Sequence, residues 1–322
     1  MRQPVLVTGG AGYVGSMVVA ELLARGYRVR VLDALLHGSI PSLLHSWGNP
    51  RFEFLHADVR DSTARANAVE GVDAIVHLAA IVGDPACARE PDVAREVNLE
   101  ATRALLDDAE RAGVERFIFA STCSNYGRMS NGGYADETFD LAPVSLYAET
   151  KVAAEHEVLS PDRELTPTCL RFATVFGTSP RMRFDLTVNE FTRDLAVRDE
   201  LVVFGEQFWR PYVHVRDAAR AIADVLEAPS EELAGEVFNV GDTNENYRKI
   251  DIVNLLQERF PKGNVEFVHR DEDPRDYRVS FEKFAKRFRF AAERSVSDGI
   301  DEVVRLLASG LVSDPFAPAY RN

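Results

Sequence analysis

The sequence predicts an α/β protein with a doubly wound parallel sheet and a second, smaller α/β domain. Strand-like apolar runs alternate with helical patterns through the first half of the chain, which is typical of a parallel sheet. A glycine-rich turn joins the first predicted strand to the first predicted helix, as in the Rossmann fold. Small or polar residues follow several of the strands, where sheets of this kind bind their ligands.

Length and charge limit the classes of protein. A chain of 322 residues holds one large domain or two closely joined ones. The net charge of −14 argues against nucleic acid and anionic membrane surfaces as partners, although an anionic small ligand needs only local arginines. We find no apolar run long enough to cross a membrane. Met1 to Pro4 lead directly into a strand-like segment, so we expect no signal peptide.

The cysteines give no sign of a disulfide framework or a metal centre. Cys87, Cys123 and Cys169 are few and widely spaced, unlike the patterns of zinc sites and disulfide-rich domains. A reducing cytoplasm is the simplest setting for such a chain.

The first strand and the turn after it predict a dinucleotide site. Residues 4–8 read as a buried strand, residues 16–25 read as a helix, and Gly9, Gly12 and Gly15 lie between them. This spacing lets the backbone turn tightly and approach a diphosphate at a helix N-terminus. A glycine turn without a ligand is the alternative, and the position between a strand and a helix favours the ligand.

The second strand, predicted over residues 28–32, ends in Asp33. Its carboxylate is placed to accept hydrogen bonds from an adenosine ribose. The negative charge would repel a 2′-phosphate and no arginine directly follows, so we expect NAD rather than NADP. A helix-capping role for Asp33 is the alternative, but Val31, Leu32 and the later Gly38 suit a strand end better.

Further strands are predicted over residues 52–55, 72–78, 116–120 and 167–172, with a helix over residues 92–111. The carboxyl ends of these strands would meet at one edge of the sheet. Asp58, after the third strand, would either contact adenine or cap a helix that starts near Asp61. His77 reads as a core residue.

A tyrosine and a lysine four residues apart form the candidate catalytic pair. On a helix, Tyr147 and Lys151 would share one face. An unperturbed tyrosine has a pKa of about 10. A nearby ammonium favours the phenolate and lowers that pKa, so the pair would act as an acid and base near neutral pH. Lys151 is the one lysine before residue 249 in an arginine-rich chain, and arginine does not release its proton usefully.

Together these motifs resemble the extended short-chain dehydrogenase/reductase family that acts on nucleotide sugars. The resemblance covers nearly the whole chain: residues 8–15 are similar to the family's cofactor loop, residues 77–80 to its fourth strand end, and residues 209–217 to its diphosphate-binding segment. It implies a Rossmann domain over residues 1–178, to which segments near 212–240 return, and a substrate-binding domain over residues 179–322. It also implies NAD as cofactor, a nucleotide-diphosphate sugar as substrate, and a homodimer.

The resemblance also assigns roles to residues. The family's catalytic hydroxyl lies four residues before a Tyr-Gly pair, which selects Thr122 as the partner of Tyr147 and Lys151. The implied cofactor-binding residues are Gly9, Gly12, Tyr13, Val14, Gly15, Asp33, Asp58, Val59, Leu78, Ala79, Ala80, Asn98, Tyr147, Lys151 and Phe172. The implied substrate-binding residues are Asp84, Cys123, Ser124, Thr174, Arg183, Arg210, Arg275 and Arg278. Either Arg275 or Arg278 would meet the diphosphate.

Departures from the family pattern bear on the reaction. Cys123 and Ser124 stand where the family's 4,6-dehydratases carry Asp and Glu, and Thr174 stands where an asparagine is common. Elimination of water needs the carboxyl pair, so we expect epimerisation at C4 by transient oxidation of the sugar. A ketoreductase or dehydrogenase, a C3/C5 epimerase that uses Cys123, and a non-catalytic NAD-binding sensor are the alternatives.

One further segment stands out. Residues 179–185 contain two arginines and an aspartate after a proline, and we expect them to begin a helix that lines the sugar or phosphate pocket. A solvated helix end is the alternative for Arg181.

Overall fold

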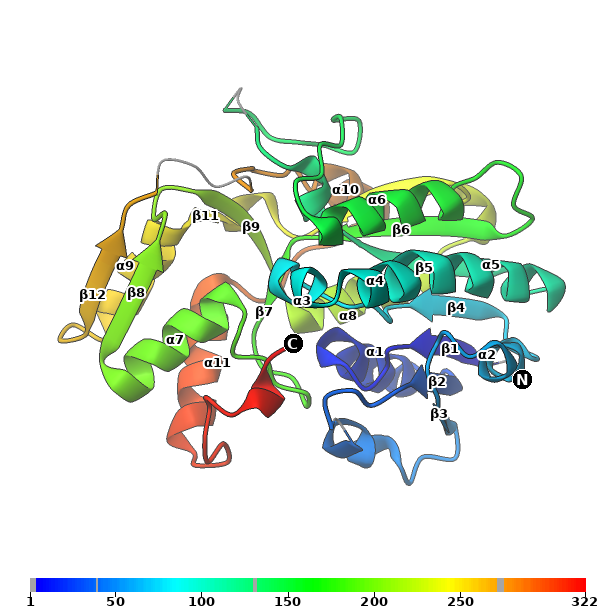
Figure 1. Cartoon of the computed structure of the whole chain (residues 1–322), viewed down its shortest axis with the longest axis horizontal. Helices are drawn as coiled ribbons and strands as arrows, with labels where there is room; N and C mark the ends of the chain where they lie inside the picture. The colour runs from blue at the N-terminus through cyan, green and yellow to red at the C-terminus, as the bar shows by residue number, and fades with distance from the viewer. Residues whose placement is uncertain (1–3, 39, 130–131, 271–274) are drawn as a thin grey trace.

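The computed structural model describes residues 4–38, 40–129, 132–270 and 275–322. Its largest element is a seven-stranded sheet in the order β10-β6-β5-β4-β1-β2-β3 (Figure 1). All neighbouring strands in it are parallel. The strands are β1 (Val5–Thr8), β2 (Val29–Asp33), β3 (Phe52–His56), β4 (Ala74–His77), β5 (Arg116–Thr122), β6 (Thr166–Phe172) and β10 (Glu236–Val240). The predicted doubly wound parallel sheet is confirmed.

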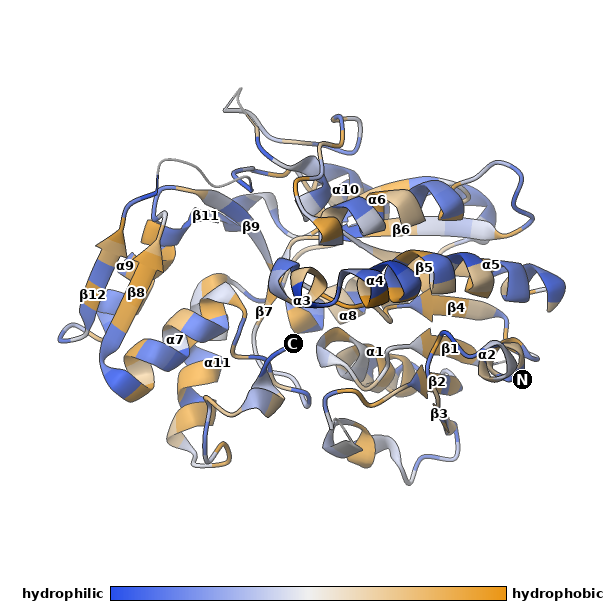
Figure 2. Cartoon of the chain, viewed as in Figure 1, coloured by the Kyte–Doolittle hydropathy of each residue, from blue (hydrophilic) through white to orange (hydrophobic). Residues whose placement is uncertain are grey.

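Helices cover both faces of this sheet, as its continuous apolar strands require. On one face lie α1 (Tyr13–Ala24) and α8 (Val215–Glu227), and on the other α2 (Ser62–Val69), α5 (Ala101–Arg111) and α6 (Leu146–Val158). Side chains of β1 alternate between the two cores, with Val5 and Val7 in the first and Leu6 in the second. Figure 2 shows the hydrophobic strands enclosed between helices whose outer faces are hydrophilic.

A smaller part of the molecule adjoins the carboxyl ends of these strands. It contains a three-stranded sheet, β11-β9-β7, and a two-stranded sheet, β12-β8. Its strands are β7 (Thr174–Phe176), β8 (Glu200–Phe204), β9 (Trp209–His214), β11 (Asn246–Arg248) and β12 (Asn264–Val268). Its helices are α7 (Thr187–Arg198), α9 (Lys249–Arg259) and α11 (Val296–Ala308), which share a core with these strands. The short helix α10 (Glu282–Phe288) packs beside β10.

The chain crosses between the two parts more than once. β9 lies in the small sheet, whereas α8 packs against α1 and β10 pairs with β6 in the large one. A domain boundary near residue 178 stays a prediction.

Two helical predictions were wrong in detail. The helix expected over residues 92–111 is divided into α4 (Pro91–Arg95), a π-helical turn (Glu96–Glu100) and α5. The segment 179–185 does not begin a helix, because α7 starts only at Thr187.

Tertiary partners explain the second error. The backbone carbonyl of Arg183 accepts a hydrogen bond from Asn189, 2.8 Å long, and the Phe184 N–H donates to the carbonyl of Tyr320, 2.9 Å away. These backbone groups are satisfied without a helix. The segment is therefore an irregular loop with several bends between β7 and α7.

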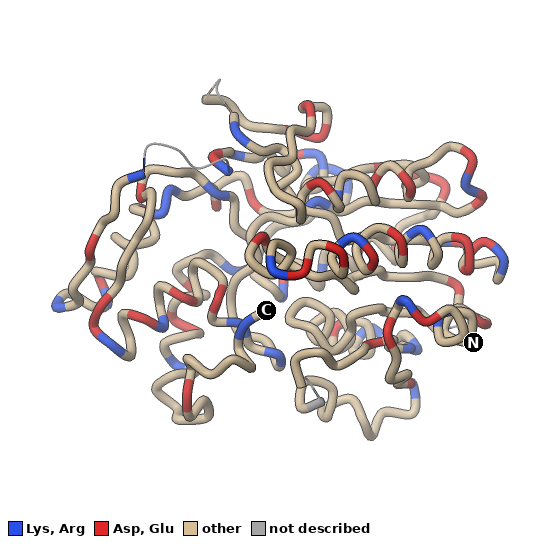
Figure 3. Tube along the Cα trace, viewed as in Figure 1, with Lys and Arg blue, Asp and Glu red and all other residues tan. Residues whose placement is uncertain are grey.

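Charges are spread over the surface rather than gathered on one face in this view (Figure 3). Acidic and basic residues alternate along α4 and α5, as for solvated helices. Among the described residues, no helix combines the length and apolar character that a membrane span requires.

Candidate active site

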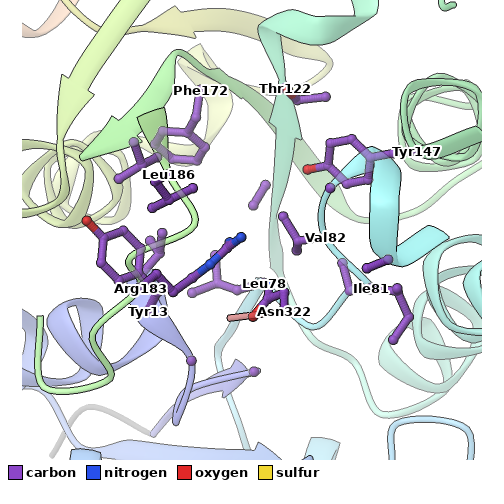
Figure 4. Close-up of a pocket in the computed structure, with 18 of the residues that line it drawn as sticks. Tyr13, Leu78, Ile81, Val82, Thr122, Tyr147, Phe172, Arg183, Leu186 and Asn322 are labelled. Carbon is purple, nitrogen blue, oxygen red and sulfur yellow. The ribbon is translucent and has the colours of Figure 1, made fainter. Parts of the chain in front are cut away.

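A cavity of about 730 Å³ lies at the carboxyl ends of the parallel strands. Thr122, Tyr147 and Lys151 all line it. Of the predicted cofactor-binding residues, all except Asn98 line it, and of the predicted substrate-binding residues, all except Cys123 and Arg278 do. In Figure 4, Thr122 and Tyr147 lie on one side of the cavity, opposite Tyr13 and Arg183.

The glycine loop has the shape of a ligand cradle. A Cβ on Gly15 would lie 2.1 Å from the carbonyl oxygen of Gly9, and one on Gly9, whose φ is +72°, would lie 2.8 Å from the backbone nitrogen of Ala79. Only glycine fits these two positions. The helix α1 begins after Gly12 without a side-chain cap, so its first N–H groups are available to an anion.

Asp33 links this loop to the end of β2. Its two carboxylate oxygens accept hydrogen bonds from Ala11 N at 2.9 Å and from Leu35 N at 2.8 Å. Burial raises the pKa of Asp33, and the two N–H donors favour its charged form. The loop, the uncapped helix and this carboxylate fit a dinucleotide with free ribose hydroxyls.

Asp58 is the second acidic residue at this end of the cavity. It forms an ion pair with Arg60, 2.8 Å long. The helix-capping role considered for Asp58 is performed by Asp61, whose side chain caps α2.

The helix α6 presents the candidate catalytic pair. Ser145 caps this helix, and its side chain accepts a hydrogen bond from Ala148 N. Lys151 is 3% exposed. Its Nζ donates to the carbonyl of Ala120, 2.9 Å away, and lies 4.6 Å from the ring centre of Phe119. These contacts hold the amine beside the end of β5, which carries Thr122.

The ionisation of the pair differs from the sequence-based expectation. Burial raises the pKa of Tyr147 above its ordinary value, and the charge of Arg183 lowers it by a smaller amount. Burial also lowers the pKa of Lys151 to about 8, opposed by the nearby charge of Glu155. The expected lowering of the tyrosine pKa by Lys151 is therefore wrong, since burial disfavours the charged form of both groups.

Asn98 and Cys123 lie behind the cavity wall and are not among the residues that line the cavity. Asn98 bonds to both backbone groups of Ile81, at 2.8 and 3.0 Å, and so shapes the loop that lines the cavity. Cys123 is 1% exposed, and its Sγ donates to the carbonyl of Arg171 at 3.2 Å. The expectation that Cys123 lies within reach of a sugar is wrong, because the tight turn after Thr122 directs its side chain into the core.

Arginines line the opposite end of the cavity, near Tyr277. Arg210 lies over the Tyr277 ring, with 5.5 Å between the guanidinium carbon and the ring centre. Arg275 forms an ion pair with Asp84, 2.9 Å long. Arg278 instead stacks on Trp209 and Tyr134, away from the cavity lining. Asp273 and Pro274, which precede Arg275 in the predicted segment, lie outside the described residues.

Ser124 and Thr174 also line the cavity. The hydroxyl of Ser124 is 3.3 Å from that of Tyr277. A polar wall here suits a ligand rich in hydroxyl groups.

The polar segment 179–185 was expected to line the pocket, and its residues Arg181, Arg183 and Asp185 do so. Sequence reasoning gave no role to several other lining residues, namely Glu190, Lys249, Tyr277, Arg321 and Asn322. Arg321 and Asn322 gave no signal in the sequence, since only the folded chain brings them to the cavity.

The sheet, the glycine loop, Asp33 and the Tyr147–Lys151 pair define an extended short-chain dehydrogenase/reductase. Residues 5–241 match the model of the NAD dependent epimerase/dehydratase family. The chain belongs to this family, and its cofactor is NAD, as predicted.

Relatives and solved structures agree with this assignment. A Bacillus subtilis strain 168 protein described as an uncharacterized UDP-glucose epimerase is 29% identical over 95% of this chain and 98% of its own length. A dTDP-glucose 4,6-dehydratase from Streptomyces griseus is 30% identical, with 94% of each chain covered. The structure of UDP-glucuronic acid 4-epimerase from Bacillus cereus, in complex with UDP-glucuronic acid and NAD, superimposes with a TM-score of 0.86 at 25% identity, over 95% of this chain and 99% of that one.

Proposed function

We propose that the protein is a nucleotide-sugar epimerase that inverts C4 of the sugar by transient oxidation to a 4-keto sugar and re-reduction. The observation that carries this choice concerns acidic side chains near the catalytic wall, the part of the cavity lining formed by Thr122, Tyr147 and Lys151. The carboxylates among the described lining residues are Asp33, Asp58, Asp84, Asp185 and Glu190. None of them follows Thr122 at the end of β5, where elimination of water would need an acid.

The cofactor would bind along the glycine loop and Asp33, with Lys151 at its nicotinamide end. When bound, NAD supplies the acceptor and donor of hydride. The protein's own residues then have to handle a single proton. Tyr147 would act as the phenolate, which the positive charges of Lys151 and of the bound oxidised cofactor favour. It would take the proton from the sugar hydroxyl and return it, while Thr122 would donate a hydrogen bond to the same oxygen.

The nucleotide diphosphate of the substrate would bind at the arginine-lined end of the cavity. Arg210 and Arg275 offer charged donors there, and Arg275 forms an ion pair with Asp84. Ser124 and Thr174 line the same cavity, and the hydroxyl of Ser124 lies beside that of Tyr277, so we assign both to the sugar subsite.

The experiment is to incubate the protein with UDP- and dTDP-linked hexoses and uronic acids in deuterated water and to follow the products by NMR. We expect one sugar pair that differs only at C4, without solvent deuterium on carbon and without net NADH. Accumulation of NADH would instead indicate a dehydrogenase, and deuterium at C3 or C5 would indicate carbanion chemistry. Tyr147→Phe should bind NAD normally but turn over at least about 100-fold more slowly, the usual contribution of such a group.

A further inference from the structure

Arg181 is a buried cation on the cavity wall with few partners. It is 5% exposed, and its Nη2 donates to the carbonyl of Arg321 at 2.9 Å. Its Nε has no hydrogen-bond partner among the described residues, and the guanidinium forms no ion pair with a described carboxylate. A buried guanidinium left in this state is costly unless an anion completes its contacts.

Hydrogen bonds fix the segment that carries Arg181 against the start of α1. Tyr13 donates its hydroxyl proton to the carbonyl of Gly177 at 2.6 Å. Ser179 donates to the carbonyl of Tyr13 at 2.7 Å, and its hydroxyl is 3.0 Å from that of Ser16. Arg181, only two residues after Ser179, is thus delivered to the same end of the cavity as the uncapped first turn of α1.

The neighbouring charges agree with this position. Burial and, to a smaller extent, the charge of Arg183 lower the pKa of Arg181 to about 10, while the carboxylates of Asp185 and Asp33 act in the opposite direction. Asp33 itself bonds to Ala11 in the glycine loop. Arg181 therefore belongs to the cofactor end of the cavity, whereas Arg210 and Arg275 lie at the Tyr277 end.

Arg183 is not equivalent to Arg181. Its Nε and Nη2 bond to the two carboxylate oxygens of Asp185, at 2.9 and 2.7 Å. That bidentate pair satisfies its charge, so Arg181 is the cation of this segment that still lacks an anion.

From these contacts we infer that Arg181 binds the diphosphate of NAD from the side opposite the N-terminus of α1. A glycine loop and helix N-terminus donate backbone N–H groups to one face of a diphosphate. A guanidinium on the other face would enclose it and supply charged, forked hydrogen bonds. The contact joins the cofactor to the smaller part of the molecule, which would retain NAD through repeated turnovers.

The C-terminal residues hold this arginine in place. The Arg321 carbonyl fixes its Nη2, the Asn322 backbone N–H donates to Asp185 at 3.1 Å, and the Asn322 carbonyl accepts from Arg89 at 3.1 Å. Figure 4 shows Asn322 among the side chains that line the cavity. Arg89 belongs to α3 (Asp84–Arg89), so these bonds bridge the cavity near Arg181.

The test measures cofactor binding by calorimetry without any nucleotide sugar, so its outcome is independent of the epimerase reaction. We expect Arg181→Gln to weaken the binding of NAD and of ADP-ribose by about 10- to 100-fold, the range for a lost charged hydrogen bond. Adenosine, which has no phosphate, should bind within 2-fold of wild type. Arg181→Lys should recover part of the NAD affinity, and the NAD dissociation constant of Arg181→Gln should depend less on salt.

Arg198→Gln is the matched control. The guanidinium carbon of Arg198 lies 3.6 Å from the ring centre of Phe316, and Arg198 is not among the residues that line the cavity. Its substitution by Gln therefore removes the same charge away from the cofactor site. The inference is overturned if Arg181→Gln binds NAD as tightly as this control does, or if the variant loses as much affinity for adenosine as for ADP-ribose. It is also overturned if NADP affinity falls while NAD affinity holds, because Arg181 would then recognise the 2′ position.

Discussion

Glu155 and Arg171 form a buried ion pair directly behind the catalytic wall. Arg171 Nη2 lies 2.7 Å from Glu155 Oε2, and the two side chains are 6% and 1% exposed. Glu155 also accepts hydrogen bonds from Ser121 and from Asn125, and Arg171 donates to Tyr126 at 3.0 Å. The network joins α6 to β5 and β6, so it fixes the helix of Tyr147 against the strand end of Thr122.

Glu155→Gln should destabilise the protein strongly, because it leaves the Arg171 charge buried without its partner. We expect a loss of about 3–5 kcal/mol in the free energy of unfolding, measured by urea denaturation. Glu157 on the same helix is the control. It pairs with Arg103 at the surface, with side chains 31% and 41% exposed, so Glu157→Gln should cost no more than about 1 kcal/mol. Equal losses in the two variants would contradict the role of the buried network.

Lys151 should make stability depend on pH between about 8 and 10.5. Burial lowers its pKa from 10.5 to about 8, so the folded state disfavours the charged amine. The penalty is present in full below pH 8 and disappears as pH rises toward the unfolded value. We expect Lys151→Met to be more stable than wild type by up to about 3 kcal/mol at pH 7, taking 1.36 kcal/mol per pKa unit. Denaturation at several pH values should show this advantage shrinking through pH 8–10.5, and a constant difference would argue against the lowered pKa.

Asp33→Ala should weaken NAD by about 10-fold or more, since it removes a charged acceptor worth about 1.5–3 kcal/mol. It should also relax discrimination against NADP, because the repelling charge is lost. Asp33→Asn separates the two effects: we expect it to keep more NAD affinity while still relaxing discrimination. Calorimetry with both cofactors measures this, and unchanged NADP affinity in both variants would contradict the charge-repulsion argument.

Arg210→Gln should raise KM for the nucleotide sugar by about 10- to 100-fold, the effect of a lost charged hydrogen bond, and leave NAD affinity unchanged. Arg278→Gln is the comparison, because Arg278 stacks on aromatic rings away from the cavity lining and should change KM by less than 2-fold. Steady-state kinetics on both variants provides the measurement. The reverse order of effects would move the diphosphate site toward Arg278.

Cys123→Ala should keep turnover within a few-fold of wild type. Burial raises the pKa of the Cys123 thiol well above its ordinary value, which makes it a poor proton donor or acceptor at neutral pH. The native thiol should also react slowly with a thiol reagent. Loss of turnover in Cys123→Ala, with partial recovery in Cys123→Ser and solvent deuterium in the product, would support the C3/C5 epimerase alternative.

Local signals in the sequence were enough to predict the parallel sheet, the glycine loop, Asp33 and the Tyr147–Lys151 pair. Alternation of strands and helices is a property of neighbouring residues, and the carboxyl ends of parallel strands must meet at one edge. Asp33 follows its strand directly, and the Tyr147–Lys151 spacing is one helical turn. Each of these features needs only a short stretch of chain.

Tertiary structure decided the rest, because the remaining features depend on residues far apart in the chain. The segment 179–185 lost its predicted helix to bonds with Asn189 and Tyr320. Arg181 lies at the cofactor end of the cavity because hydrogen bonds between Tyr13 and Gly177 and between Ser179 and Tyr13 hold its segment against α1. The pKa of Tyr147 rose rather than fell, since burial depends on every element packed around the group. The sequence specified which chemical groups are present, and the folded chain determined which of them are buried and which come into contact.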